Sequence, residues 1–261
     1  MSDSCYDHCR QVFLEETKIL KDLLGSEFVT SNHIGSTSVK NLLSKPNTDI
    51  ALEVRNLDDI VVKIENAGYT YKGELNIPFR HFFSKNTDDR HINLHVTEEG
   101  NPEVIGFLLF RNYIEDHKEA MDKYIELKKS IAKNNAPKKG QLLGDYTLAK
   151  DDFIRKILKK AGFEGLCMRY VTHYNERKYA DKYKSVYECM ELVFYKGPQI
   201  IGYCGINQNL DIEIFEIEEK QYENHFRAKI ERLINQKKRT KLTTRIVHNI
   251  DYLNIVCFAR V

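Results

Sequence analysis

Tryptophan is absent from this chain of 261 residues, proline occurs only five times, and there is no long hydrophobic run. The longest strongly apolar segment, Val104 to Phe110, is far shorter than the roughly 20 residues that a membrane-spanning helix needs. The formal net charge of +2 excludes a general, charge-driven affinity for nucleic acids or membranes. With 42% apolar and 30% charged residues, the composition is that of an ordinary globular protein with one large domain or two small ones.

The six cysteines are scattered without a Cys-x-x-Cys pair, and the first residues do not form a basic and then apolar signal segment. We therefore expect reduced thiols and a cytoplasmic location. Cys5 and Cys9 are one helical turn apart. We expect them to be small apolar residues rather than half of a metal site.

The pattern of hydrophobic residues differs between two regions of the chain. We expect a boundary at residues 162–165 and domains over 1–163 and 166–261. In the first region the expected helices are 6–24, 38–44, 58–66, 102–116, 118–133 and 145–161, and the expected strands are 27–33, 48–54, 80–84 and 91–97. In the second region the expected strands are 166–174, 189–195, 199–207, 210–217, 242–248 and 255–261, with a helix over 218–236.

The stretch His33-Ile-Gly-Ser-Thr-Ser38, followed by Lys45-Pro46 and Asp49, carries the most chemical information. A glycine at position 35 lets the backbone approach a phosphate closely. The next hydroxyl and the free N–H groups of a helix start can hold phosphate oxygens, and a carboxylate on the following strand can bind magnesium. This order predicts a site for a metal-bound nucleotide. The alternative is that the glycine and serine only shape a helix cap.

Asp49 lacks a second carboxylate at the best position on its strand. Residues two apart on a strand share a face and lie roughly 6.6 Å apart, but position 51 holds alanine. Glu53 is roughly 13 Å from position 49, too far to share one ion easily. On the adjoining strand, His95 could be a metal ligand, a general base or a phosphate contact, and the alternative is a half-buried structural histidine.

These residues, taken in order, resemble the opening motif of the GrpB-like family of the nucleotidyltransferase superfamily. The resemblance extends over residues 5–163. Its further matches are Gly73-Glu74, Ile77-Pro78, Arg80, Arg90, Leu94-His95-Val96, Phe110-Arg111-Asn112-Tyr113, Tyr124, Leu127-Lys128, Tyr146 and Lys150.

The resemblance implies an α/β (α+β) fold, a mixed sheet flanked by helices with the Gly35-Ser36 turn at its mouth. It implies a transferase that uses Mg²⁺ and passes a nucleoside monophosphate from a nucleoside triphosphate to an unknown acceptor. Asp49 would bind the metal, with His95 as a second candidate for the catalytic and metal roles. The candidate nucleotide contacts are Gly35, Ser36, Thr37, Lys45, Arg80, Arg111, Lys128 and Lys150.

These candidate contacts also have an alternative interpretation, in which the residue does not contact a ligand. Lys128 and Lys150 could be solvated residues of amphipathic helices, and Arg80 and Arg111 could be structural ion-pair partners. The chain departs from the family pattern at Lys40-Asn41, Ala51 and Asn93. These departures affect catalysis more than fold, so a module that binds a nucleotide or phosphorylated ligand without turnover stays open.

The second region resembles part of a GNAT-type acetyltransferase. The segment from Glu191 to Tyr203 is similar to the central hairpin of that fold, and a helix follows the next strand. That helix should begin at a glycine-rich turn that binds pyrophosphate, but residues 218–227 contain no glycine and are acidic. We therefore expect a degenerate GNAT-like α+β domain without catalysis. Acetyl transfer by this domain is the third functional alternative.

Overall fold

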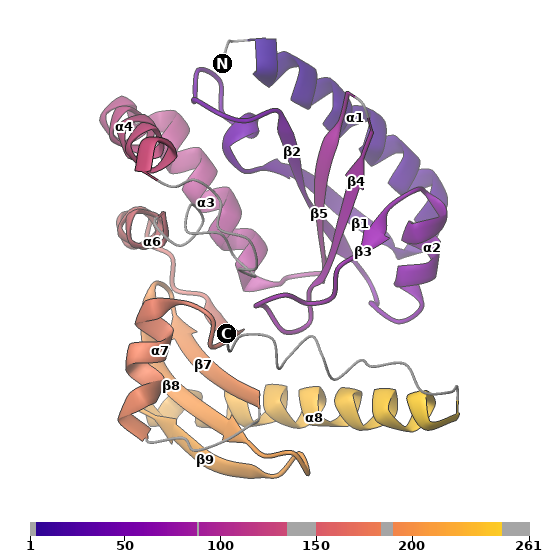
Figure 1. The fold of residues 1–261 in the computed structure, drawn as a ribbon, viewed down its shortest axis with the longest axis vertical. Coiled ribbons are helices and arrows are strands. Elements are labelled where there is room, and N and C mark those ends of the chain that lie inside the picture. Colours follow the sequence, from indigo (N-terminus) through magenta and orange to yellow (C-terminus); the bar gives the residue numbers. More distant parts are fainter. Residues whose placement is uncertain (1–3, 88, 135–149, 184–189, 247–261) are drawn as a thin grey trace. The chain divides into compact units, whose positions relative to one another are not determined.

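The structure is a computed structural model that describes residues 4–87, 89–134, 150–183 and 190–246. The chain divides into two compact units (Figure 1), and the main division falls between Gly165 and Leu166. The first unit contains a mixed five-stranded sheet and the second an antiparallel four-stranded sheet, each with helices. The predicted class, a mixed sheet flanked by helices plus a smaller α+β unit, is confirmed.

The first sheet places the predicted site face on two neighbouring strands. Its order is β1 (Phe28–Ile34), β2 (Asn47–Val54), β5 (His91–Glu98), β4 (His81–Asn86) and β3 (Thr70–Tyr71). Strands β2 and β5 are parallel, and all other neighbours are antiparallel. Asp49 is paired with Asn93, and Ala51 with His95. Because side chains alternate along a strand, these four residues share one face of the sheet.

The opposite face is the main core of the first unit. Helices α1 (Ser4–Leu24) and α2 (Ile60–Asn66) cover it (Figure 1). Even-numbered strand residues such as Ile50 and Leu94 pack there against Leu20 of α1 and Ile64 of α2. This alternation of apolar and polar residues leaves Asp49 and its neighbours on the other side.

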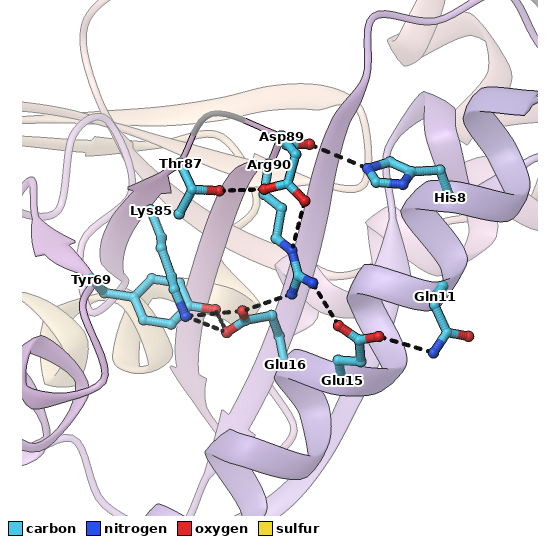
Figure 2. A network of polar contacts seen from close by, with 9 residues as sticks. All are labelled: His8, Gln11, Glu15, Glu16, Tyr69, Lys85, Thr87, Asp89 and Arg90. Atoms are coloured by element: carbon cyan, nitrogen blue, oxygen red, sulfur yellow. Dashed lines mark hydrogen bonds and ion pairs between the residues drawn. The ribbon is translucent and has the colours of Figure 1, made fainter.

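A buried carboxylate ties α1 to the sheet (Figure 2). Glu16 is 1% exposed and accepts hydrogen bonds from Lys85 Nζ at 2.9 Å and Tyr69 Oη at 3.0 Å. The neighbouring Glu15 lies on the surface and pairs with Arg90 at 2.9 Å. Glu16 thus satisfies a buried hydroxyl and a largely buried ammonium group at once.

Three helices flank the site face. They are α3 (Pro102–Asp116), α4 (Lys118–Asn134) and α6 (Asp151–Lys160). Asn101 caps α3 by accepting a hydrogen bond from the Glu103 N–H, and Pro102 occupies the first helical position. Val104 of α3 packs on Ile34 and Ala51, so position 51 belongs to a small apolar cluster. The 3₁₀ turn η2 (Ser36–Ser38) follows β1, and Val39 beyond it packs on residues of α3, α4 and α6.

The second unit has one antiparallel sheet with the order β6-β7-β8-β9. Its elements are β6 (Leu166–Tyr170), α7 (Tyr174–Ala180), β7 (Met190–Lys196), β8 (Gln199–Ile206), β9 (Ile212–Ile217) and α8 (Glu223–Ile246). Phe226 of α8 stacks on Phe194 of β7 with ring centroids 4.4 Å apart. A Cβ at Gly202 would lie 2.7 Å from the Phe194 ring and 2.6 Å from Glu216 O, so this packing needs glycine.

Two element predictions are wrong. The helix predicted over 38–44 is absent, because Gly35 and Asn41 both have positive φ angles and the chain forms only the η2 turn before β2. The strand predicted over 242–248 is helical as far as Ile246, since α8 meets no glycine or proline after Glu223. The strand that was predicted over 166–174 ends at Tyr170, where α7 soon follows. Residues 145–149, 247, 248 and 255–261 lie outside the described part of the chain.

No helix within the described ranges combines the length and the apolar character that a bilayer crossing requires.

Candidate functional site

The turn after β1 brings the backbone of Gly35 against the carboxylate of Asp49. Gly35 has φ 74° and ψ −169°, a conformation that L-residues rarely adopt. A Cβ added at this position would lie 2.2 Å from Asp49 Oδ2. The turn therefore requires glycine for its backbone angle and for the close approach. The antiparallel pairing of Ile34 with Asp49 brings Gly35, the next residue of the motif, close to Asp49.

Asp49 is half-buried and accepts a hydrogen bond from Asn93 Nδ2 at 2.8 Å. Burial raises the pKa of its carboxyl group, whereas the Asn93 hydrogen bond and the ammonium groups of Lys150 and Lys128 oppose that rise. Asp49 is thus a carboxylate whose nearest charged neighbours are cations.

Lys128 reaches the turn from α4. Its Nζ donates to Ser36 Oγ at 2.5 Å and to Leu43 O at 2.7 Å, and it lies 4.7 Å from the centre of the Tyr124 ring. Burial, and then the charge of Lys150, lower the pKa of Lys128 to about 7, although Asp49 acts in the opposite direction. The interpretation of Lys128 as a solvated helix residue is therefore wrong, because its side chain is buried at the turn.

Lys150 acts on the Asp49 carboxylate, and Lys45 acts in turn on Lys150. Burial lowers the pKa of Lys150, Asp49 raises it and Lys45 lowers it. Lys45 itself is exposed just before β2. Three ammonium groups and one carboxylate leave a positive balance, which suits an anionic ligand such as a phosphate chain.

Thr37 and Arg111 hold the turn from inside. The Thr37 hydroxyl is buried and donates to Asn47 O at 2.7 Å, and His33 Nε2 lies 3.2 Å from it. Arg111 Nη1 donates to His33 O at 2.9 Å. The structure therefore places both residues as supports of the turn, next to the cation group but not in it.

His95 and Arg80 form a separate pair on the same face. Arg80 Nη1 lies 3.3 Å from His95 Nδ1, and Arg80 Nη2 donates to Glu74 O at 3.1 Å. The His95 ring packs edge-to-face on Phe82 and Phe107. Burial and the Arg80 charge hold the pKa of His95 well below its ordinary value, so its ring is neutral.

Asp49 and His95 do not form a ready-made metal centre. The strand register sets His95 opposite Ala51 and places Asn93 opposite Asp49. Across residues 4–87, 89–134, 150–183 and 190–246, no three His, Cys, Asp or Glu side chains come together as a metal site. The structure joins Gly35, Ser36 and Asp49 with the lysines and leaves His95 with Arg80.

Two contributions to the site were not predicted, namely the hydrogen bond from Asn93 and the carbonyl of Leu43. The alternation of β5 puts Asn93 on the same face as His95, which is a signal that the sequence does contain. Its position opposite Asp49 follows only from the parallel register with β2, which no local pattern specifies.

Comparison with known proteins identifies relatives of the first unit. The family model described as GrpB protein matches residues 6–160. UPF0157 protein YqkA of Bacillus subtilis is 35% identical over 148 residues, which are 56% of this chain and 42% of YqkA. UPF0157 protein BH1888 of Halalkalibacterium halodurans is 31% identical over 154 residues, 58% of this chain and 76% of that protein.

A solved structure agrees with these matches. The crystal structure of conserved protein GrpB from Enterococcus faecalis superimposes with a TM-score of 0.52 and 32% sequence identity, covering 59% of this chain and 92% of that one. Because the family model covers more than half of the residues and contains the whole Gly35–Asp49 motif, this chain belongs to the GrpB family.

Proposed function

We propose that the first unit is a nucleotidyltransferase that binds a nucleoside triphosphate and passes its nucleoside monophosphate to an acceptor. The observation that carries this proposal is the approach of the Gly35 backbone to Asp49 beside Lys128 and Lys150. Gly35 is exposed next to this carboxylate, and the ammonium groups would offset the charge of phosphate oxygens bound there. Lys45 is placed to extend this contact to the solvent side.

Asp49 fits a magnesium ion that arrives with the nucleotide. Magnesium is usually held by one or two carboxylates together with substrate phosphates and water. One half-buried carboxylate next to a phosphate site meets that description, whereas a preformed ion cage would need more protein ligands. When bound, the ion would neutralise phosphate charge and align the phosphate chain. The residues of the chain would bind and orient the nucleotide, with Asn93 holding the Asp49 carboxylate in place.

A second candidate is a module that binds the nucleotide without turnover. The observation that favours it is Ala51, which is fully buried in an apolar cluster where a second carboxylate would otherwise complete a metal pair. The net charge of +2 argues against nucleic acid as a partner.

Asp49→Asn tests the metal role. We expect the wild-type chain to bind at least one of ATP, GTP, CTP and UTP more tightly with magnesium than without it in calorimetric titrations. The variant should lose that magnesium dependence, because its amide no longer offers an anionic ligand, while binding without magnesium stays equal or improves. Glu53→Gln, on the same strand face but four residues further on, is the matched control and should behave as wild type.

The outcome of the titration separates the candidates. No binding of any of the four nucleotides at millimolar concentration would refute both. Binding with release of labelled pyrophosphate in the presence of cell extract supports transfer, whereas binding without release supports the module without turnover. An Asp49→Asn variant that keeps its magnesium dependence would remove Asp49 from the metal role.

For the second unit, the proposal is a non-catalytic GNAT-like domain. The segment at the start of α8 contains Glu218, Glu219 and Glu223 and would repel the pyrophosphate of coenzyme A. Measurable binding of acetyl-CoA would instead favour acetyl transfer. A cytoplasmic location remains part of the proposal and rests on the scattered cysteines and on the nucleotide substrate.

A further inference from the structure

Ser36 has a hydroxyl group with one defined partner, in a side chain that is only partly buried. Among the described residues, its Oγ is hydrogen-bonded only to Lys128 Nζ, at 2.5 Å. The side chain is half-buried, and the preceding Gly35 is exposed. A hydroxyl has one hydrogen and two lone pairs, so Ser36 can give its hydrogen to an amine and still present oxygen to a ligand.

Lys128 is held in a position from which it can accept that hydrogen. Leu43 O takes one N–H of the amine at 2.7 Å, and Nζ lies 4.7 Å from the centre of the Tyr124 ring. A neutral amine placed this way has its lone pair free for Ser36. The charged groups that face Lys128 are Lys150, which disfavours the protonated amine, and Asp49, which favours it.

A lysine with a lowered pKa can act as the general base that activates a neighbouring serine, and the pair Lys128 and Ser36 resembles that arrangement. With a pKa of about 7, Lys128 is partly neutral at physiological pH, and burial is the main cause. An ordinary surface lysine, with a pKa near 10.4, would be charged and could not act as a base.

We propose that Ser36 is a nucleophile, that Lys128 is its general base, and that the pair attacks the α-phosphorus of a nucleoside triphosphate. The Ser36 Oγ–P bond forms, the Pα–O bond to the β-phosphate breaks, pyrophosphate leaves, and the hydroxyl proton moves to Lys128 Nζ. The acceptor then attacks the serine-bound phosphorus, the Ser36 Oγ–P bond breaks, Ser36 Oγ regains a proton from Lys128, and the proton of the acceptor passes to water. The choice of substrate rests on the proposed function, whereas the activated hydroxyl does not.

The surroundings favour a phosphoanhydride over an uncharged acyl substrate. Lys150 is close enough to Asp49 to act on the pKa of its carboxyl group, and Lys45 is close enough to Lys150 to lower the pKa of that lysine. These ammonium groups would stabilise the negative charge of a polyphosphate, which an acyl ester does not carry. Gly35, which precedes Ser36, is exposed.

A fluorophosphonate probe tests the hydroxyl without any nucleotide. We expect the probe to label Ser36, as located by peptide mass spectrometry, and Ser36→Ala to abolish this labelling. Lys128→Arg should slow labelling by about 100-fold or more, because a guanidinium cannot take the proton. Wild-type labelling should rise with pH through about 7, as Lys128 loses its proton. Lys129→Arg and Ser130→Ala, exposed neighbours on α4, should leave the rate unchanged.

Labelled nucleotide tests the complete proposal. With α-labelled triphosphate the label should remain on denatured wild-type protein and be absent from Ser36→Ala, and γ-labelled triphosphate should leave none. Failure of the probe to label Ser36, or equal labelling of wild type and Lys128→Arg, would overturn the activated hydroxyl. Transfer to an acceptor without a protein-bound label would overturn the covalent step and leave the proposed function standing. Probe labelling without nucleotide binding would overturn the phosphoanhydride as substrate, together with the proposed function.

Discussion

Gly35→Ala is expected to destabilise the first unit by roughly 2–5 kcal/mol and to abolish nucleotide binding. An L-residue at φ 74° costs roughly 1–2 kcal/mol. A methyl group placed 2.2 Å from Asp49 Oδ2 forces the turn or the carboxylate to move, and overpacking of this kind costs roughly 1–3 kcal/mol. Either movement separates the backbone from Asp49, so binding should fail even where the protein still folds.

Gly25→Ala is the matched control for the backbone angle. Gly25 also has a positive φ, 55°, but a Cβ there would meet nothing within 4 Å. Its cost should be near 1 kcal/mol, with nucleotide binding unchanged. Urea denaturation at constant slope measures both free energies of unfolding, and calorimetric titration measures binding. Equal losses of stability in the two variants would show that the approach to Asp49 is unimportant.

Glu16→Ala should be the most damaging change outside the site, with a loss of about 3–5 kcal/mol in the free energy of unfolding. The substitution leaves the Tyr69 hydroxyl and the Lys85 ammonium, which is 17% exposed, without their carboxylate partner. Glu15→Ala provides the control one residue away. Glu15 is 41% exposed and pairs with Arg90 on the surface, where ion pairs contribute about 0–1 kcal/mol.

A double variant separates the lost charge partner from lost packing. Glu16→Met combined with Lys85→Met should recover much of the stability, because apolar residues of similar volume often replace a buried ion pair at little cost. Denaturation curves of the single and double variants measure the coupling. If Glu16→Ala and Glu15→Ala had equal free energies of unfolding, the buried contacts of Glu16 in Figure 2 would contribute no more to stability than the surface pair of Glu15.

The elements of this fold follow from local chemistry where that chemistry is strong. The predicted helix over 102–116 agrees with α3 at both ends, because Asn101 and Pro102 define its start. Strands β2 and β5 were predicted to within one residue at each end by their apolar alternation. Residues 38–44 were misassigned because their apolar content resembles a helix, while positive φ at Gly35 and Asn41 breaks the chain there.

The site was predicted as a list of residues but not as an arrangement. The motif predicted Gly35 and Asp49 in one site, and the close approach of the two residues is a finding of the structure. Nothing near Lys128 in the sequence reveals that its side chain is buried against Ser36, because that environment comes from the packing of α4. Likewise His95 was grouped with Asp49 from its strand, whereas its position opposite Ala51 follows from the register and its contact with Arg80 from packing.

The parallel pairing of β2 with β5 also affects the order in which the contacts of this protein form during folding. Asp49 and Asn93 are 44 positions apart, and Ser36 and Lys128 are 92 apart. Parallel strands cannot close through a tight hairpin, and contacts between distant residues form slowly because long loops must be ordered first. The contact between Ser36 and Lys128 can therefore form only after α4 has been synthesised, and we expect it to be a late contact in folding.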